Sequence, residues 1–81
     1  MPRHRHAFVE NYDGMMAFGY SREEDERSLI VFLQKFSDDD LMGLLCRRLG
    51  DSEIEELVDH ITGLMKRHLS EAEYHQYFLK E

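Results

Sequence analysis

Pairs of glutamate and histidine are the residues of this chain whose types and spacing come closest to a chemical site. Glu56 and His60, and likewise Glu71 and His75, stand four residues apart, so each pair shares one face of a helix. Imidazole is the commonest metal ligand in proteins. His60 and His68 lie eight residues apart, about 80° around a helix, unlike the facing pair of an HExxH motif. An exposed contact worth about 0.2–0.5 kcal/mol is the commoner origin of such pairs.

We therefore expect no metal and no other cofactor. The same three histidines and two glutamates remain the ligand candidates of an alternative hypothesis, a metal- or cofactor-binding helical domain.

Other groups with chemical potential have structural explanations. Cys46 is the only cysteine, which excludes an internal disulfide and fits a reducing compartment; we expect it to be a small buried hydrophobe. Asp38, Asp39 and Asp40 are consecutive, so on a helix they point 100° apart and cannot converge on one cation. The chain has no nucleophile motif and no glycine-rich phosphate loop. These observations predict a protein that is not an enzyme.

The elements that must position these residues are marked by serines, each followed three residues later by an acid. A serine hydroxyl at a helix start accepts from a free backbone N–H, and the acid favours the positive end of the helix dipole. The four pairs are Ser21/Glu24, Ser37/Asp40, Ser52/Glu55 and Ser70/Glu73. They predict four short helices, at about 22–36, 38–49, 53–69 and 71–79.

Apolar periodicity supports the same helices. The third predicted helix places Ile54, Leu57, Val58, Ile61, Leu64 and Met65 at the i, i+3, i+4, i+7 spacing of one helical stripe. The breaks between helices span only one to three residues, which suits steep packing angles better than a long parallel bundle. We expect a mainly α fold, with residues 21–81 forming a single compact domain of four steeply packed helices.

Residues 1–20 differ from the rest and are expected to form an N-terminal arm or a β-hairpin. Asp13-Gly14 lies between two apolar segments, which is the usual signal for a two-residue type I′ turn. Pairing outward from this turn gives a possible hairpin at 7–20 with one largely apolar face. An irregular arm lying over the helices is the alternative.

Charge and hydropathy limit the partners. The net charge of −7 is distributed as zero over residues 1–20, −2 over 21–50 and −5 over 51–81. Binding to a nucleic-acid duplex normally requires a basic face, so we expect no nucleic-acid partner. No apolar run approaches the roughly 20 residues of a membrane span, and residues 1–20 do not resemble a signal peptide. We expect a cytoplasmic protein without a membrane partner.

The remaining hypothesis is a non-enzymatic protein–protein interaction module that self-associates, most simply as a homodimer. Adaptable surfaces rich in methionine and aromatic residues often bind partners. The candidate surface residues are Phe8, Val9, Met15, Met16, Phe18, Tyr20, Ile30 and Phe32. A further alternative is an antitoxin-like or accessory regulator, whose acidic body would bind a basic partner.

Overall fold

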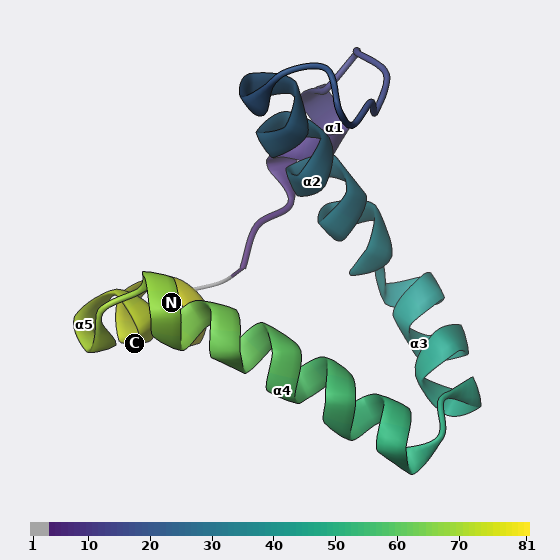
Figure 1. Cartoon of the computed structure of the whole chain (residues 1–81). Coiled ribbons are helices and arrows are strands. Elements are labelled where there is room, and N and C mark those ends of the chain that lie inside the picture. Colours follow the sequence, from purple (N-terminus) through teal and green to yellow (C-terminus); the bar gives the residue numbers. More distant parts are fainter. Residues whose placement is uncertain (1–3) are drawn as a thin grey trace. The chain divides into compact units, whose positions relative to one another are not determined.

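The computed structural model describes residues 4–81, and their fold is mainly helical, as predicted (Figure 1). A short helix α1 (Ala7–Asn11) precedes α2 (Arg22–Phe36), α3 (Asp39–Arg48) and α4 (Asp51–His68). The last segment starts as α5 (Glu71–Glu73) and continues into a π-helix, η1 (Tyr74–Leu79). The four helices expected from the serine signals are therefore confirmed, with ends that differ by at most two residues.

The chain forms two compact units, one of Arg5–Arg47 and the other including Arg48–Glu81. The first contains α1, α2 and α3 up to Arg47, and the second contains α4, α5 and η1. The single four-helix domain predicted for residues 21–81 stays a prediction. The N-terminal arm was predicted for residues 1–20, and its first three residues lie outside the described residues.

Two of the four predicted helix starts form as the serine–acid pattern indicates. The Ser21 hydroxyl accepts from the Glu24 backbone N–H at 3.1 Å, which starts α2. Ser70 forms a reciprocal pair with Glu73: its hydroxyl accepts the Glu73 N–H at 3.1 Å, and the Glu73 carboxylate accepts the Ser70 N–H at 2.8 Å. These contacts satisfy N–H groups that a helix leaves free.

The other two starts use different residues from those predicted. Asp38, rather than Ser37, caps α3: its Oδ2 accepts the backbone N–H groups of Asp40 at 3.1 Å and Leu41 at 3.3 Å. Helix α4 begins after Gly50, whose N–H donates to Glu53 Oε1 at 2.8 Å, and Ser52 lies inside the helix. Neighbouring Ser, Asp and Gly compete for the same role, so the pattern locates a helix start only to within two residues.

The β-hairpin predicted at 7–20 was wrong. Over residues 4–81 there is no strand, and Ala7–Asn11 forms α1, which lies against α2 (Figure 1). A type I′ turn needs positive φ at both central residues, whereas the one glycine with positive φ in the described chain is Gly19, at 93°. The physical reason is that the segment's backbone groups bond to α2 side chains, which removes them from any cross-strand pairing.

Few side chains are buried. Among residues 4–81, Val31 is the one apolar side chain in the buried class, at 2% exposure, and Ser28 is fully buried beside it on the same helix. Most of the apolar residues expected to form a core therefore stay partly accessible. Cys46, expected to be buried, is exposed.

Candidate interaction surfaces

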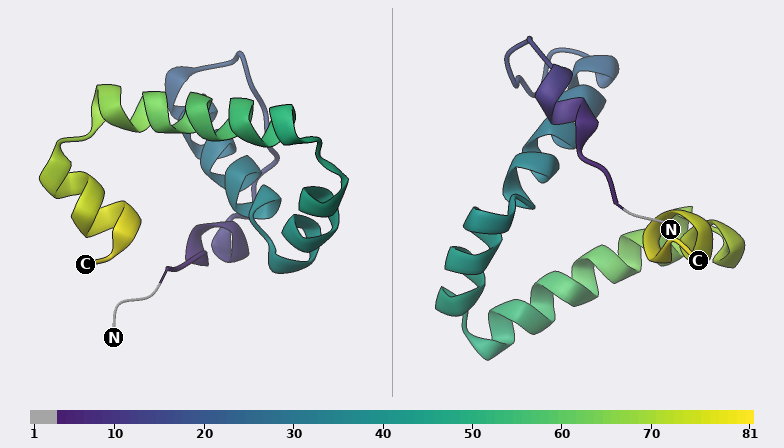
Figure 2. Two further views of the ribbon diagram at one scale, coloured as in Figure 1. Left: turned by 90° about the horizontal axis from the view of Figure 1, so that it is seen from below. Right: turned by 180° about the vertical axis from the view of Figure 1, so that it is seen from behind.

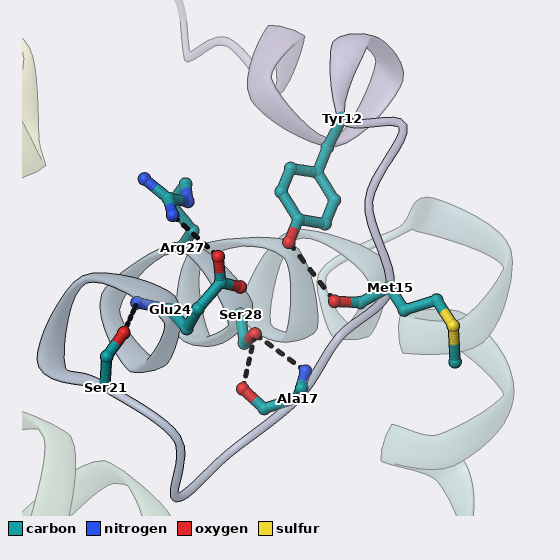
Figure 3. Close-up of polar contacts among 7 residues, drawn as sticks. All are labelled: Tyr12, Met15, Ala17, Ser21, Glu24, Arg27 and Ser28. Carbon is teal, nitrogen blue, oxygen red and sulfur yellow. Dashed lines mark hydrogen bonds and ion pairs between the residues drawn. The ribbon is translucent and has the colours of Figure 1, made fainter.

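Residues 5–20, here called the arm, are held on α2 by hydrogen bonds from two α2 side chains. At the first contact the Val9 backbone N–H, inside α1, donates to Gln34 Oε1 at 2.8 Å. At the second, Ser28 bonds both polar groups of Ala17: its hydroxyl donates to the Ala17 carbonyl at 2.9 Å and accepts the Ala17 N–H at 2.9 Å (Figure 3). A single buried hydroxyl thus replaces the two hydrogen bonds that a partner strand would have supplied.

The two ends of the arm are fixed by further polar contacts. His6 Nε2 lies 2.8 Å from Ser37 Oγ, which follows the end of α2. The Gly19 N–H donates to Asp25 Oδ1 at 2.8 Å, and the positive φ of Gly19 turns the chain before α2 begins. Between these ends, the Tyr12 hydroxyl donates to the Met15 carbonyl at 3.2 Å and closes a short loop (Figure 3). These contacts tie the arm to α2, to the residue that follows α2, and to itself.

This docking leaves an apolar surface on the outside of the arm and α2, here called the arm surface. Met15 is 85% exposed and Tyr20 is 82% exposed. The ring of Phe18 packs edge-on against that of Phe32 with centroids 6.5 Å apart, and both rings keep about half their area accessible. The arm surface comprises Met15, Met16, Phe18, Tyr20 and Phe32.

Two of the remaining predicted surface residues lie in α1. Phe8 stacks on Tyr12 with centroids 5.8 Å apart and an angle of 20° between the rings. Val9 is only partly accessible, because its backbone is bonded to α2. The structure therefore places four of the eight predicted residues in the loop before α2 and two on α1. Phe32 lies against Phe18 of the loop, whereas Ile30 lies about 200° around α2 from Phe32, on the other side of the helix. Whether any of them binds a partner stays a prediction.

Two ion pairs lie on the first turns of α2. Arg27 pairs with Glu24 at 2.7 Å, and Arg22 pairs with Glu26 at 2.7 Å (Figure 3 shows the first pair). The hydrogen bond and negative charge of Glu24 raise the pKa of Arg27 further above its ordinary value. Both pairs are exposed and bridge one helical turn, so they contribute little to stability.

A second apolar surface lies on α4. Ile54, Leu57, Ile61 and Leu64 follow one another along the helix at spacings of three, four and three residues, and Val58 lies beside them. Each of the five is between 39% and 56% exposed. Helix α4 is continuous over all its 18 residues (Figure 2). The structure leaves this stripe accessible.

The C-terminal segment turns back over the end of α4. A cavity of about 420 Å³ lies between them, and its lining includes Thr62, Met65, Leu69 and Tyr74. Tyr74 stacks on Phe78 with centroids 5.2 Å apart. Lys80 adopts a left-handed conformation, and the Glu81 N–H donates to the His75 carbonyl at 3.0 Å, which ends the π-helix. The segment thus covers the Met65 side of α4 but not the stripe from Ile54 to Leu64.

The residues considered as metal ligands do not form a site in the described chain. Over residues 4–81 there is no cluster of three or more His, Cys, Asp or Glu side chains that could hold a metal ion. His75 pairs through Nδ1 with the Glu81 carboxylate instead of with Glu71. His60 and His68 both lie on α4, as does Glu56, and all three are exposed. The geometry gives the metal-binding hypothesis no support.

A polar hollow of about 590 Å³ lies where α1, the end of α2 and the start of α3 meet. Its charged lining residues are Glu10, Lys35, Asp38 and Asp39, with His6 at one side. All of these five are exposed. Exposed charges of both signs are typical of a solvated groove rather than of a ligand pocket, which is usually concave and mostly apolar.

Sequence reasoning missed the two residues that create the arm surface, Ser28 and Gln34. Ser28 interrupts the apolar side of its helix, and a polar residue in such a position usually bonds to backbone. That signal identifies a buried hydrogen bond but not its partner, because Ala17 lies eleven residues away in a loop.

Comparisons with family models, with curated proteins and with solved structures gave no match for this chain. Across the described part of the chain, no helix combines the length and the apolarity that crossing a membrane requires.

Proposed function

We propose that this chain is a non-enzymatic protein-interaction module that self-associates, with the arm surface as a binding surface. One observation carries the proposal: the arm is fixed on α2 by side-chain hydrogen bonds, yet its largest apolar side chains stay exposed. Met15 and Tyr20 each keep more than four fifths of their area exposed in this ordered segment. An ordered apolar surface on a small protein is a feature of interaction sites.

The small size of the unit supports the proposal. Arg5–Arg47 contains 43 residues, close to the length of about 40 residues below which a chain usually needs external stabilisation. Within it, Val31 is the single apolar side chain classed as buried. Covering the arm surface would add buried apolar area at about 25 cal/mol per Å². A second copy is the simplest source of such cover, because most soluble oligomers are homo-oligomers.

The experiment is analytical ultracentrifugation of the untagged protein and a double variant, Met15→Ser with Tyr20→Ser. Both side chains are so exposed that their loss should leave the fold intact, which circular dichroism would check. We expect the wild type to sediment as an oligomer. The variant should dissociate at concentrations at which the wild type stays associated, because its Kd is raised by about tenfold or more. The matched control is Glu23→Gln, an exposed α2 residue outside the surface.

An unchanged sedimentation coefficient in the double variant would contradict the role of the arm surface. A wild-type chain that is monomeric at all concentrations would contradict self-association altogether. Recovery of a stoichiometric basic protein with the untagged chain would instead favour the acidic regulator.

A further inference from the structure

We infer that the apolar stripe of α4 is covered by α4 of a second copy running in the opposite direction. The inference rests on the proposed self-association but concerns a different surface from the arm. Within the unit Arg48–Glu81, α5 and η1 turn back over the Met65 side of α4 and leave the stripe uncovered.

The spacing of the stripe suits pairing with another helix. Ile54, Leu57, Ile61 and Leu64 recur at intervals of three, four and three residues, which is the a/d pattern that keeps one seam facing a partner helix. Two antiparallel copies interleave these residues in four layers. Ile54 then meets Leu64 of the second copy, and Leu57 meets Ile61, each contact occurring twice by symmetry.

The charge distribution along α4 determines the direction. Residues 51–60 carry five acids and no lysine or arginine, whereas residues 61–68 carry Lys66 and Arg67 and no acid. Two parallel helices would align like charges, and two antiparallel helices place the acidic half of each against the basic end of the other. Antiparallel alignment also opposes the two helix dipoles favourably.

One specific contact follows from the same register. Glu53 and Arg67 occupy equivalent positions beside the seam, fourteen residues or two heptads apart. In an antiparallel pair these positions face each other across the interface, so Glu53 of one copy lies opposite Arg67 of the other, twice. Glu53 uses Oε1 to accept the Gly50 N–H at 2.8 Å, and its second oxygen is free of this contact. Such flanking pairs set partner choice and orientation.

The other side of the seam carries Val58, which is 56% exposed. In the antiparallel register it meets Val58 of the second copy at the symmetry axis. The stripe is thus self-complementary, as an isologous two-fold interface requires. The charges of α4 are self-complementary as well, because its acidic half and its basic end lie on the same helix.

A charge-exchange experiment tests the inference. One chain carries Glu53→Arg and the other carries Arg67→Glu, so each homodimer faces like charges and the mixed dimer faces opposite charges at both contacts. Native mass spectrometry resolves the three dimers. Random pairing makes the mixed dimer one half of all dimers. We expect its ratio to the two homodimers together to rise about fivefold or more, to roughly 80% of all dimers. The control pair, Glu56→Arg and Lys66→Glu, has the same charge changes on the outer face and should mix statistically.

Disulfide trapping tests the direction independently, in a Cys46→Ser background. Ile54→Cys chains mixed with Leu64→Cys chains should form mixed disulfide dimers in a glutathione buffer, and neither chain alone should do so. Self-linked Ile54→Cys dimers would overturn the antiparallel arrangement.

Statistical mixing in the charge exchange, or a monomeric wild type, would overturn the inference as well. If the arm double variant stays oligomeric while the charge exchange succeeds, the arm proposal fails and the α4 inference stands. If the arm double variant dissociates while the charge exchange gives statistical mixing, the α4 inference fails and the arm proposal stands.

Discussion

Ser28 fixes the arm through both hydrogen-bonding functions of one hydroxyl. It is fully buried, and both of its bonds go to Ala17. Removing the hydroxyl leaves the Ala17 N–H and carbonyl without their partner, and buried polar groups that lose a partner cost about 1–3 kcal/mol.

We therefore expect Ser28→Ala to lower the free energy of unfolding by about 1–3 kcal/mol, as measured by urea denaturation. The Ala17 amide should also exchange its hydrogen faster in NMR experiments. Ser52→Ala is the control, because the Ser52 side chain has no hydrogen bond in the structure and is exposed; it should change stability by less than about 0.5 kcal/mol. Equal effects of the two substitutions would show that Ser28 does not form these two hydrogen bonds with Ala17.

Two glycines have opposite conformational roles. Gly19 has φ of 93°, a region that costs other residues about 1–2 kcal/mol. Gly43 lies inside α3, and a Cβ there would meet no atom within 4 Å. Gly19→Ala should therefore destabilise the protein by about 1–2 kcal/mol, and Gly43→Ala should stabilise it by about 0.5–1 kcal/mol. Thermal melts of the two variants beside wild type measure both signs, and a stabilising Gly19→Ala would contradict the turn geometry.

At the scale of the element, Asp38 determines where α3 begins. Its carboxylate accepts two backbone N–H groups, from Asp40 and Leu41, whereas its neighbour Asp39 is in the first turn and has no such bond. Losing an aspartate cap typically costs about 0.5–2 kcal/mol, and losing only the dipole contribution of an acid costs about 0.3–1 kcal/mol.

We therefore expect Asp38→Ala to lower the free energy of unfolding by roughly 1 kcal/mol more than a dipole effect alone, and Asp39→Ala to have the smaller effect. Chemical denaturation of both variants at neutral pH makes the comparison. If Ser37 were the cap, as the sequence pattern predicts, Asp38→Ala would be the milder of these two substitutions.

At the scale of the whole molecule, folding and association should be linked. A protein stabilised by a second copy gains stability by mass action, so its melting temperature depends on concentration. For a dimer of 81-residue chains, we expect a rise of about 4 °C for each tenfold increase in concentration. Differential scanning calorimetry over a hundredfold range measures it. A constant melting temperature would mean that each chain folds alone.

The sequence by itself determined the local elements and the charge pattern. The helix starts at Ser21 and Ser70 follow from contacts between residues three apart, and the stripe of α4 follows from one helical periodicity. Such features depend on residues that are close together in the chain, so they can be predicted without knowledge of the tertiary structure. The sequence did not decide whether Ser37 or Asp38 caps α3, because the two residues are adjacent and compete for one cap position.

Only the tertiary structure decided the conformation of the arm and the exposure of the apolar faces. The hairpin signal at Asp13-Gly14 was overridden because Ser28 and Gln34, eleven and twenty-five residues from their partners, bind the backbone of Ala17 and Val9. Periodicity shows that a helix has an apolar side but not what covers it. That depends on which surfaces meet in space, and here the stripe of α4 stays uncovered within its unit.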